Sequence, residues 1–485
     1  MIDTSAEYKD AVLAPSRHLQ PKVDVYFDGD NSAPTSFEGD VVSSITFLEE
    51  ARTESDSPLG LVSSNEVTIT FKNEDRVFSP NNTSSPYHGR LLPNILVEPY
   101  LGLYVLLEEG EGEEEDVYGF EYVPLGKFRT SDWIAASNDI FATVTCYDKL
   151  RQLEDIPIPS LPVQHDTTVG EMFETLFQAM ELEPEDYVID DTISAPISLG
   201  WFPEGRFLRC IQQLAIAGNC SVTVNREGAI RVRSNFQMAE AVVSWNEEDA
   251  VLDVDSPQTY LNTYSSVTTK YHRPFLGPIE EVLQIDTITV PAGGMVLDDL
   301  SFSRSPVGRV RQIVITGGSD ITADVTEIGA HSLRLEIDNP GARQAIGIIV
   351  YGQIVDTVKS SHNIISESLQ DIIGHKDLTI DNYLIQDYDA AKDYATLTLQ
   401  VLSNPAPEVT ANVRGDPSVE IGDVITIEDE THLLDTVDIL PSRITLDYAG
   451  GLRGTVTGIK TELLEIHDWV YMGPGLYAKV LREVT

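Results

Sequence analysis

The sequence contains few cysteines, few lysines and no long hydrophobic run. Its three cysteines, Cys146, Cys210 and Cys220, are too few for a disulfide framework in 485 residues, and none stands in Cys-X-X-Cys spacing. We expect three reduced, mostly buried thiols, with one bridge between Cys210 and Cys220 as the local alternative. No stretch approaches the roughly 18 apolar residues that span a bilayer, and the first residues do not resemble a secretory signal. The sequence therefore predicts a soluble globular protein.

The motifs of the common enzyme classes are also missing. There is no Gly-X-Ser-X-Gly elbow, no His-Glu-X-X-His helix, no Walker loop and no Rossmann glycine fingerprint. The nearest approach to a histidine group is His331, His362 and His375, and nothing at metal-ligand spacing accompanies it. We interpret these as surface or satisfied core histidines. The prediction is no catalytic, cofactor-binding or metal-binding residue.

Acidic residues are too abundant to single out catalytic carboxylates. With 78 Asp and Glu, a pair for glycoside hydrolysis can always be imagined, because sequence does not report the separation between two carboxyl groups. We interpret Asp190-Asp191 and Asp253-Val-Asp255 as solvated turn or strand residues. Seven of the nine residues in 108–116 are acidic and two are Gly, which predicts a solvated hairpin tip. Binding of a hard cation stays open there, although no loop of EF-hand type is present.

Cations are scarce. The 32 Lys and Arg against 78 Asp and Glu give a net charge of −46, which argues against a nucleic-acid-binding surface, since such surfaces need clustered cations. The one dense basic segment, 226–233, is interpreted as a hairpin with alternating Arg. Only 11 of the cations are Lys, a balance typical of proteins that are soluble in concentrated salt. An ordinary acidic protein whose charge faces solvent or a lumen is the alternative, and salt-dependent stability separates the two.

Hydrophobic periodicity predicts a mainly β chain with one helical interlude. Alternation is clearest in Val67-Thr-Ile-Thr-Phe71 and Ala142-Thr-Val-Thr-Cys146. The strands expected in the first part of the chain are 22–27, 41–48, 66–72, 95–108, 119–129 and 141–147. A short helix over 149–155 follows, and then Pro157, Pro159 and Pro162 form a stiff linker.

The period then changes to that of helices with one buried face. Segments 167–180, with a Thr start, and 206–218, ending at Gly218, predict two helices, followed by two strands around a turn at 226–228. The next region returns to strands broken by Gly and Pro, which predicts a β-sandwich or barrel; these strands are 284–290, 309–316, 332–337 and 346–355. A helix over 387–402, with Ala390, Ala391, Ala395 and Leu399 on one side, leads into the last part of the chain.

The last quarter reads as a small β-barrel module. Val424, Ile425 and Ile427 are β-branched, Gly415 and Gly422 stand with Asp where tight turns are needed, and a Gly-Gly pair at 450–451 separates two alternating runs. The Gly415-Asp-Pro417 approach, the strand Gly422-Asp-Val-Ile-Thr-Ile427 and the hairpin Tyr448-Ala-Gly-Gly-Leu452 resemble the tail hub proteins of tailed phages, a group that includes baseplate hubs and late control proteins.

The order of the earlier modules extends this resemblance over most of the chain. Gly126-Lys-Phe-Arg-Thr-Ser-Asp-Trp133 and Thr143-Val-Thr-Cys-Tyr-Asp-Lys149 end the first β module, and Trp201 precedes the second helix. The resemblance implies a multidomain, mainly β protein with a smaller α+β unit. The domains expected are 1–159, a first tube-like β-barrel; 160–245, an α+β domain; 246–375, a β-sandwich or barrel insertion; and 376–485, a second tube-like β-barrel.

The resemblance also implies a function. In such hubs, two tube-like barrels per subunit form a trimeric, pseudo-hexameric ring that joins the tail tube to a tip or spike. The expected partners are two further copies, a tail tube or distal tail protein, a tip, spike or tape measure protein, and passing genomic DNA without specific binding. The expected location is the distal end of the tail of a virion assembled in the host cytoplasm. A receptor-binding or adhesin tail protein, and a glycan-cleaving tail enzyme, are the alternatives that stay open.

Overall fold

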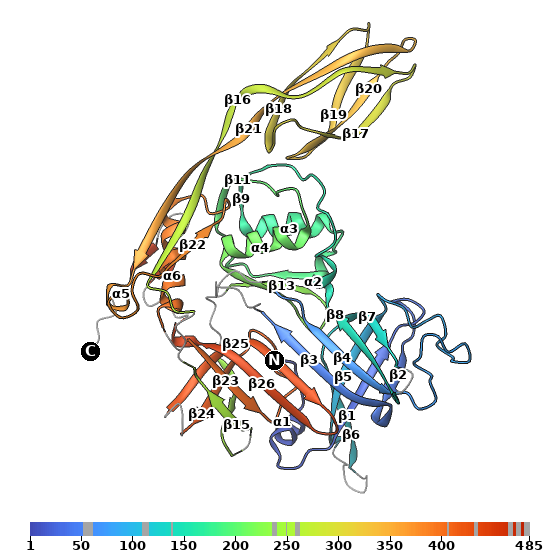
Figure 1. Ribbon diagram of the computed structural model, residues 1–485, viewed down its shortest axis with the longest axis vertical. Coiled ribbons are helices and arrows are strands. Elements are labelled where there is room, and N and C mark those ends of the chain that lie inside the picture. Colours follow the sequence, from blue (N-terminus) through green and yellow to red (C-terminus); the bar gives the residue numbers. More distant parts are fainter. Residues whose placement is uncertain are drawn as a thin grey trace.

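The protein is described by a computed structural model, in which β-strands predominate (Figure 1). The residues that the structure describes are 1–51, 62–108, 116–136, 139–234, 240–248, 250–257, 262–404, 407–430, 435–463, 469–471 and 477–479. Two β modules lie side by side at one end of the molecule, an α+β unit stands on them, and a long arm reaches past that unit (Figure 1). The predicted fold class, mainly β and multidomain with a smaller α+β unit, is confirmed.

The first β module follows a short helix, α1 (Ala6–Leu13). Its strands are β1 (Leu19–Val25), β2 (Thr35–Glu38), β3 (Val42–Glu50), β4 (Glu66–Lys72), β5 (Leu96–Glu108), β6 (Val117–Pro124), β7 (Phe128–Ile134) and β8 (Phe141–Tyr147). Strands β4 and β8 alternate buried and half-buried side chains along almost their whole length, as their sequences predicted. The expected strand 119–129 is wrong as a single element. It breaks after Pro124, because Gly126 adopts a φ of 135°, which favours glycine.

The second β module draws its strands from two distant parts of the sequence. They are β14 (Ala241–Trp245), β15 (Val251–Asp255), β23 (Glu408–Val413), β24 (Val424–Asp429), β25 (Asp435–Tyr448) and β26 (Leu452–Lys460). The expected hairpin turn at 450–451 joins β25 to β26, with Gly450 at a φ of 79°. Strands β14 and β15, on either side of the domain boundary expected after residue 245, both pair with strands from the last quarter of the chain.

The α+β unit contains two packed helices, a short third helix and two small sheets, one of three strands and one of two. Its elements are α2 (Lys149–Gln152), β9 (Gln164–Thr168), α3 (Val169–Ala179), β10 (Tyr187–Ile189), β11 (Pro196–Gly200), α4 (Phe207–Gly218), β12 (Cys220–Val224) and β13 (Ile230–Ser234). A capping box at Thr168 and Glu171 starts α3. The second helix ends at Gly218, as expected, and Asn219 follows it in the left-handed conformation, with a φ of 47°. Gly218 allows close packing, because an added Cβ would lie 2.9 Å from Val169 Cγ1.

The arm, defined as Ser266–Ile365 and bounded by its two longest strands, is an antiparallel ribbon with a small two-sheet sandwich at its far end (Figure 1). Its strands are β16 (Ser266–Val290), β17 (Met295–Ser301), β18 (Val307–Thr316), β19 (Thr322–Ile328), β20 (Ser332–Asp338) and β21 (Gln344–Ile365). The strands expected at 284–290 and 346–355 are only the far segments of β16 and β21, so the ribbon itself was not predicted. Helices α5 (Glu367–Ile373) and α6 (Tyr388–Leu402) and strand β22 (Asp377–Asp381) lie at its base.

Helix α6 confirms the helix expected at 387–402. Asp387 caps it by accepting a hydrogen bond from the Ala390 N–H at 2.7 Å. Its buried face includes Ala391, Ala395 and Leu399, which pack in one cluster with Val267 and Tyr271 of the ribbon. The domain boundaries themselves stay a prediction. The strands β27 (Trp469–Tyr471) and β28 (Tyr477–Lys479) form a separate pair near the end of the chain.

Candidate functional site: the junction of the two β modules

The two β modules are parts of one fourteen-stranded sheet, because β3 of the first pairs with β25 of the second. The antiparallel register runs from Glu50 opposite Arg443 to Ile45 opposite Tyr448. At the start of this register the Arg443 Nε lies 3.1 Å from the Glu50 Oε1. One hydrophobic core continues beneath the seam and includes Phe47 of β3 and Ile444 of β25, both fully buried. Burial of apolar side chains in this shared core is the main contribution that holds the two modules together.

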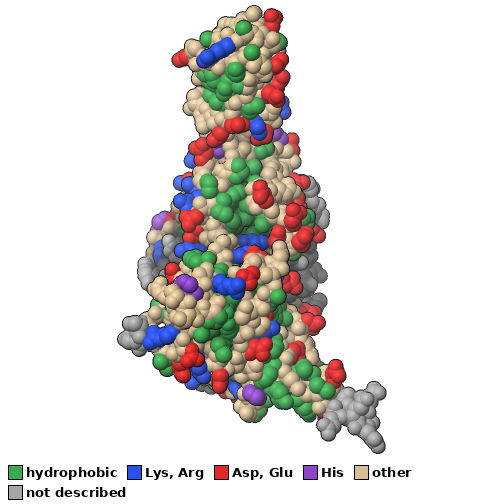
Figure 2. Space-filling view, turned by 90° about the vertical axis from the view of Figure 1, so that its right-hand side faces the viewer, with side chains coloured by type: hydrophobic (Ala, Val, Ile, Leu, Met, Phe, Trp, Pro, Cys, Tyr) green, Lys and Arg blue, Asp and Glu red, His purple; other side chains and the backbone are tan. Residues whose placement is uncertain are grey.

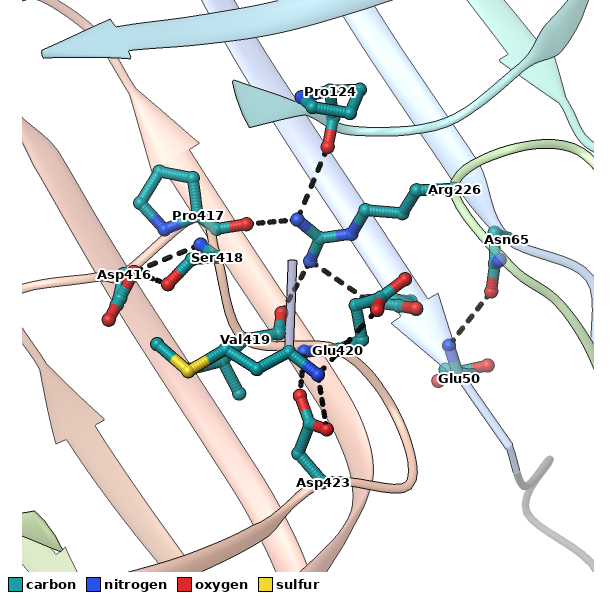
Figure 3. Close-up of polar contacts among 12 residues, drawn as sticks. Glu50, Asn65, Pro124, Arg226, Asp416, Pro417, Ser418, Val419, Glu420 and Asp423 are labelled. Atoms are coloured by element: carbon teal, nitrogen blue, oxygen red, sulfur yellow. Dashed lines mark hydrogen bonds and ion pairs between the residues drawn. The ribbon is translucent and has the colours of Figure 1, made fainter. Parts of the chain in front are cut away.

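A buried arginine from the α+β unit closes the seam from one side (Figure 3). Arg226 lies in the turn between β12 and β13, and its guanidinium reaches both β modules. It donates to the Pro124 carbonyl at 3.3 Å in the first module, and to the Pro417 and Val419 carbonyls in the second. Its Nη2 also lies 3.1 Å from the Glu49 Oε2 of β3. Arginine suits this position because its planar fork offers several fixed donors at once.

Burial decides the electrostatics of this ion pair. The Arg226 and Glu49 side chains are only 1% and 3% exposed. Burial raises the pKa of Glu49, while the guanidinium of Arg226 acts in the opposite direction. The Arg226 guanidinium also lies 5.2 Å from the centre of the Phe47 ring, so an aromatic face covers the charge. Removal of either partner would leave an isolated charge in the core.

A second pair of arginines joins the start of the chain to the second module in a reciprocal way. Arg17 donates to the carbonyls of Arg414, of Gly415 at 2.7 Å and of Leu452 at 3.0 Å. Arg414 in turn donates to the Ala14 and Pro15 carbonyls at 2.7 and 2.9 Å. Burial, and next the nearby Arg414, lower the pKa of Arg17. The Arg17 guanidinium thus binds carbonyls next to Arg414, and the Arg414 guanidinium binds carbonyls near Arg17. These reciprocal hydrogen bonds fix the two segments to one another.

The α+β unit is also tied to the first module through an asparagine. The Asn65 Nδ2 donates to the Val224 carbonyl at 3.0 Å, and its Oδ1 accepts from the Glu50 N–H at 3.1 Å. The Asn65 N–H in turn donates to Asp148 at 2.7 Å, and Asp148 also caps α2. Complete burial raises the pKa of Asp148 to about 7, against the hydrogen bonds that favour its charged form. The junction therefore holds a carboxyl group that titrates near neutral pH.

The residues singled out in the sequence lie away from this junction or within ordinary structure. All three cysteines are free and buried, as expected, and burial raises the pKa of Cys210 to about 11. The Asp190 carboxylate accepts from the Thr192 N–H and hydroxyl in a turn, and Asp191, Asp253 and Asp255 are exposed. Most of the predicted acidic tip, 109–115, lies outside the described residues.

The three histidines have separate environments. The His331 Nε2 lies 2.8 Å from the Phe202 carbonyl, His362 packs edge-on against Tyr388, and His375 is exposed. Burial lowers the pKa of His362, with Lys392 as the second cause. Among the described residues, no group of three or more His, Cys, Asp or Glu is placed to hold a metal ion. That part of the chain also contains no helix with both the length and the apolar character needed to cross a membrane.

Sequence reasoning missed Arg17, Glu49, Arg226 and Arg414 as a set. It interpreted the basic segment 226–233 as a hairpin, and β12 and β13 confirm that interpretation. The sequence offered one signal, which is its small number of lysines and arginines. In a chain with so few cations, an arginine in a tight turn after the apolar strand Val222-Thr-Val224 is a candidate for a buried role. The partner carbonyls, however, come from segments up to 435 residues apart, so pattern could not identify them.

The charge of the surface differs from that of the junction. Figure 2 shows acidic side chains spread along the whole length of one face of the molecule, with hydrophobic side chains between them. Carboxylates that are dispersed in this way do not form a single binding site. The fold and the junction together define a multidomain, mainly β protein in which two β modules are fixed to one another as one unit.

A scan of the sequence against protein-family models found no match, and neither did a search of curated proteins. Several solved structures are similar in fold. A 43 kDa tail protein of prophage MuSo2 from Shewanella oneidensis is 11% identical, with a TM-score of 0.49 over 92% of this chain and 100% of that chain. A tail protein from Neisseria meningitidis is 10% identical, with a TM-score of 0.49 over 91% and 96% of the two chains.

A third structure is an Escherichia coli component of the type VI secretion system, described as structurally similar to the T4 bacteriophage tail proteins gp27 and gp5. It is 9% identical, with a TM-score of 0.39 over 90% of this chain and 76% of that chain. The solved structures that are similar in fold thus include proteins described as tail proteins.

Proposed function

We propose that this chain is a structural virion protein: a tail hub that forms a trimeric ring at the distal end of a viral tail. The ring would join the tail tube to the tip or spike and line the channel through which the genome passes. The observation that carries this proposal is the junction, where β3 and β25 make one sheet of the two β modules. Each chain then contributes two adjacent modules at a fixed geometry, and three chains supply six.

The ends of the sheet support assembly with further copies. Within the described residues, β2 pairs only with β1, and β15 pairs only with β23, so each has one free edge. Free edges are sites at which another strand adds, and proteins usually cover them. Copies arranged head to tail in a closed ring would cover both ends at once.

The net charge of −46 fits a channel for DNA. Phosphates are repelled by carboxylates, so a genome would slide through an acidic lumen without adhering. The proposed partners are therefore two further copies, a tube or distal tail protein, a tip, spike or tape measure protein, and DNA in transit. We propose no enzymatic activity; in support, the singled-out residues that the structure describes, such as Asp190 and His331, lie in turns, in packed surroundings or at the surface.

Mass measurement of the purified full chain tests the trimer. The expected result is a species of three chains, at low salt or, where repulsion opposes assembly, at molar salt, with a central opening in electron micrographs. A chain that stays monomeric in both salts would overturn the trimeric hub. Incubation with host envelope polysaccharide tests the remaining enzyme alternative. Product release that depends on one carboxylate would overturn the structural role.

A further inference from the structure

The charge of the arm differs sharply from that of the rest of the chain. The arm carries eight Lys and Arg against eleven Asp and Glu, a net charge of −3 over 100 residues. The other 385 residues carry 24 against 67, a net charge of −43. Copies of a strongly acidic protein repel one another, and the repulsion is weakest where the local charge is lowest. The arm is therefore the part of the molecule where two copies approach with the least electrostatic opposition.

The middle of the arm is a ribbon of two strands. At the base of the arm, β22 pairs with β16, and this pairing ends where Asp381 lies opposite Lys270. Toward the far end, β18 pairs with the part of β21 from Gly347 to Ile354. Between these limits the segment Arg273-Pro-Phe-Leu276 pairs with Val355-Asp-Thr-Val358, and at its far end the Val355 N–H also donates to the Pro306 carbonyl at 2.9 Å. Two strands without a third strand or a covering helix are marginally stable in water. One face of the segment, at Val355, is buried beside Gly308 of β18, so the other face is the one that a further surface would cover.

One face of this segment carries four exposed side chains in a checkerboard. Arg273 lies opposite Val358, and Phe275 lies opposite Asp356, so the two apolar and the two charged side chains lie on opposite diagonals. Phe275 and Val358 are 47% and 55% exposed. Neither Arg273 nor Asp356 forms an ion pair with any other described residue; Arg273 lies 5.5 Å from the Tyr271 ring instead. We call this face the checkerboard face.

We infer that the checkerboard face is a contact between copies of this chain. Phe275 and Val358 of each copy pack against the same residues of its neighbours, and Arg273 of one copy pairs with Asp356 of another. A foreign partner with a strongly basic surface would be drawn to the acidic body in preference to this near-neutral segment. A second copy presents the required apolar side chains and both charges. This inference rests on the proposed trimer, since it specifies one of the surfaces that hold the copies together.

The test compares full-length variants by mass under the salt condition in which the unchanged chain assembles. Phe275→Ser with Val358→Ser is expected to raise the dissociation constant by about tenfold or more, because two apolar contacts per copy are lost. Ile372→Ser is the matched control, since Ile372 of α5 is 79% exposed and lies outside the arm. Unchanged far-ultraviolet circular dichroism and an unchanged melting transition of the body would show that the variants still fold.

A direct contact measurement completes the test. Phe275→Cys is expected to cross-link copies with a short bis-maleimide, while Ile372→Cys is not; the three native cysteines are buried. Unchanged assembly of the double Ser variant, or equal loss in the Ile372→Ser control, would overturn the inference while the trimeric hub still stood. A chain that forms only dimers, which the double variant dissolves, would support the checkerboard contact and overturn the trimer. An unchanged chain that stays monomeric would overturn both.

Discussion

The body of the molecule and its arm use arginine in opposite ways. In the body, Arg17, Arg226 and Arg414 donate to backbone carbonyls where separate segments meet. In the arm, Arg309 and Arg311 are exposed on the edge strand β18. A guanidinium has five donors, so it holds segments together where carbonyls converge, whereas on β18 the exposed Arg311 donates to the side chain of Gln353 on the neighbouring strand, at 2.7 Å. The environment, not the residue type, decides which role an arginine has.

The largest expected effect comes from the buried pair. Arg226→Ala leaves the Glu49 carboxylate in the core without its partner, so we expect the free energy of unfolding to fall by about 3–5 kcal/mol. Urea denaturation measures this change. Arg309→Ala in the arm is the control, with an expected change within about 0.5 kcal/mol, because Arg309 is exposed.

A double variant separates the charge from the contacts. Arg226→Met with Glu49→Leu removes both charges, and we expect it to recover part of the lost stability. Equal losses in the single and double variants would show that the carbonyl contacts matter and the ion pair does not. An effect of Arg226→Ala as small as that of Arg309→Ala would contradict the assigned difference between body and arm.

The body and the arm also differ in how much of their structure the sequence predicted. Apolar residues that recur every two residues predicted β4 and β8, and a recurrence every 3.6 residues predicted α3 and α6. Such patterns can be recognised locally, because they depend only on which face of the element is buried. The ribbon was not predicted, since the region was interpreted as separate strands broken by Gly and Pro, and Gly277 and Pro278 precede the first of those strands. In the structure these two residues lie at a register shift within a continuous strand. The junction was out of reach for another reason: Glu49 and Arg226 are 177 residues apart, and nothing local records that they meet.

The next expected effect is a dependence on pH at the base of the α+β unit. Burial raises the pKa of Asp148 to about 7, while an unfolded aspartate titrates near its ordinary value of 3.8. Between these values the folded protein keeps a proton that the unfolded chain has lost, so stability falls as pH rises from about 4 to about 7. The loss is at most about 4 kcal/mol, since each pKa unit corresponds to about 1.4 kcal/mol.

Asp148→Asn tests this assignment by removing the titration. The variant loses some stability at every pH, because an amide replaces one oxygen that accepts from the Asn65 or Leu150 N–H. Its urea midpoint should nevertheless decline less than that of the unchanged chain between pH 4 and 7. Parallel profiles of the two proteins would show that Asp148 stays ionised throughout the range.

A smaller effect is expected where the arm meets the body. The Ala330 N–H donates to the Leu161 carbonyl at 2.7 Å, and the Ser160 hydroxyl accepts from the His331 N–H at 2.9 Å. A Cβ on Gly329 would lie 2.2 Å from the Ser160 carbonyl oxygen, so Gly329→Ala must displace this contact. We expect a loss of about 1–3 kcal/mol, confined to the arm.

Hydrogen exchange at 329–332 and 158–162 measures this loss locally. Gly341→Ala is the control, because its Cβ would meet only side-chain atoms of Gln344 and Asn339, at 3.2 and 3.4 Å. Faster exchange is expected in the Gly329 variant and not in the control. Faster exchange throughout the β modules as well would mean that the arm and the body unfold together, and the comparison between them would lose its basis.

The smallest expected effect on stability comes from the loss of a surface ion pair of the arm. Like the buried pair of the body, it joins an arginine to a glutamate. The Arg304 Nη1 lies 2.7 Å from the Glu280 Oε1, but the two side chains are 59% and 32% exposed. Water and salt screen this pair, so Arg304→Ala should lower stability by less than about 1 kcal/mol, and by nothing measurable in molar salt. The loss from Arg226→Ala should persist in molar salt, because ions do not enter the core. Denaturation of both variants at two salt concentrations makes the measurement. If both losses faded with salt, the Arg226 and Glu49 pair would be accessible to solvent, and burial would not be what distinguishes the arginines of the body from those of the arm.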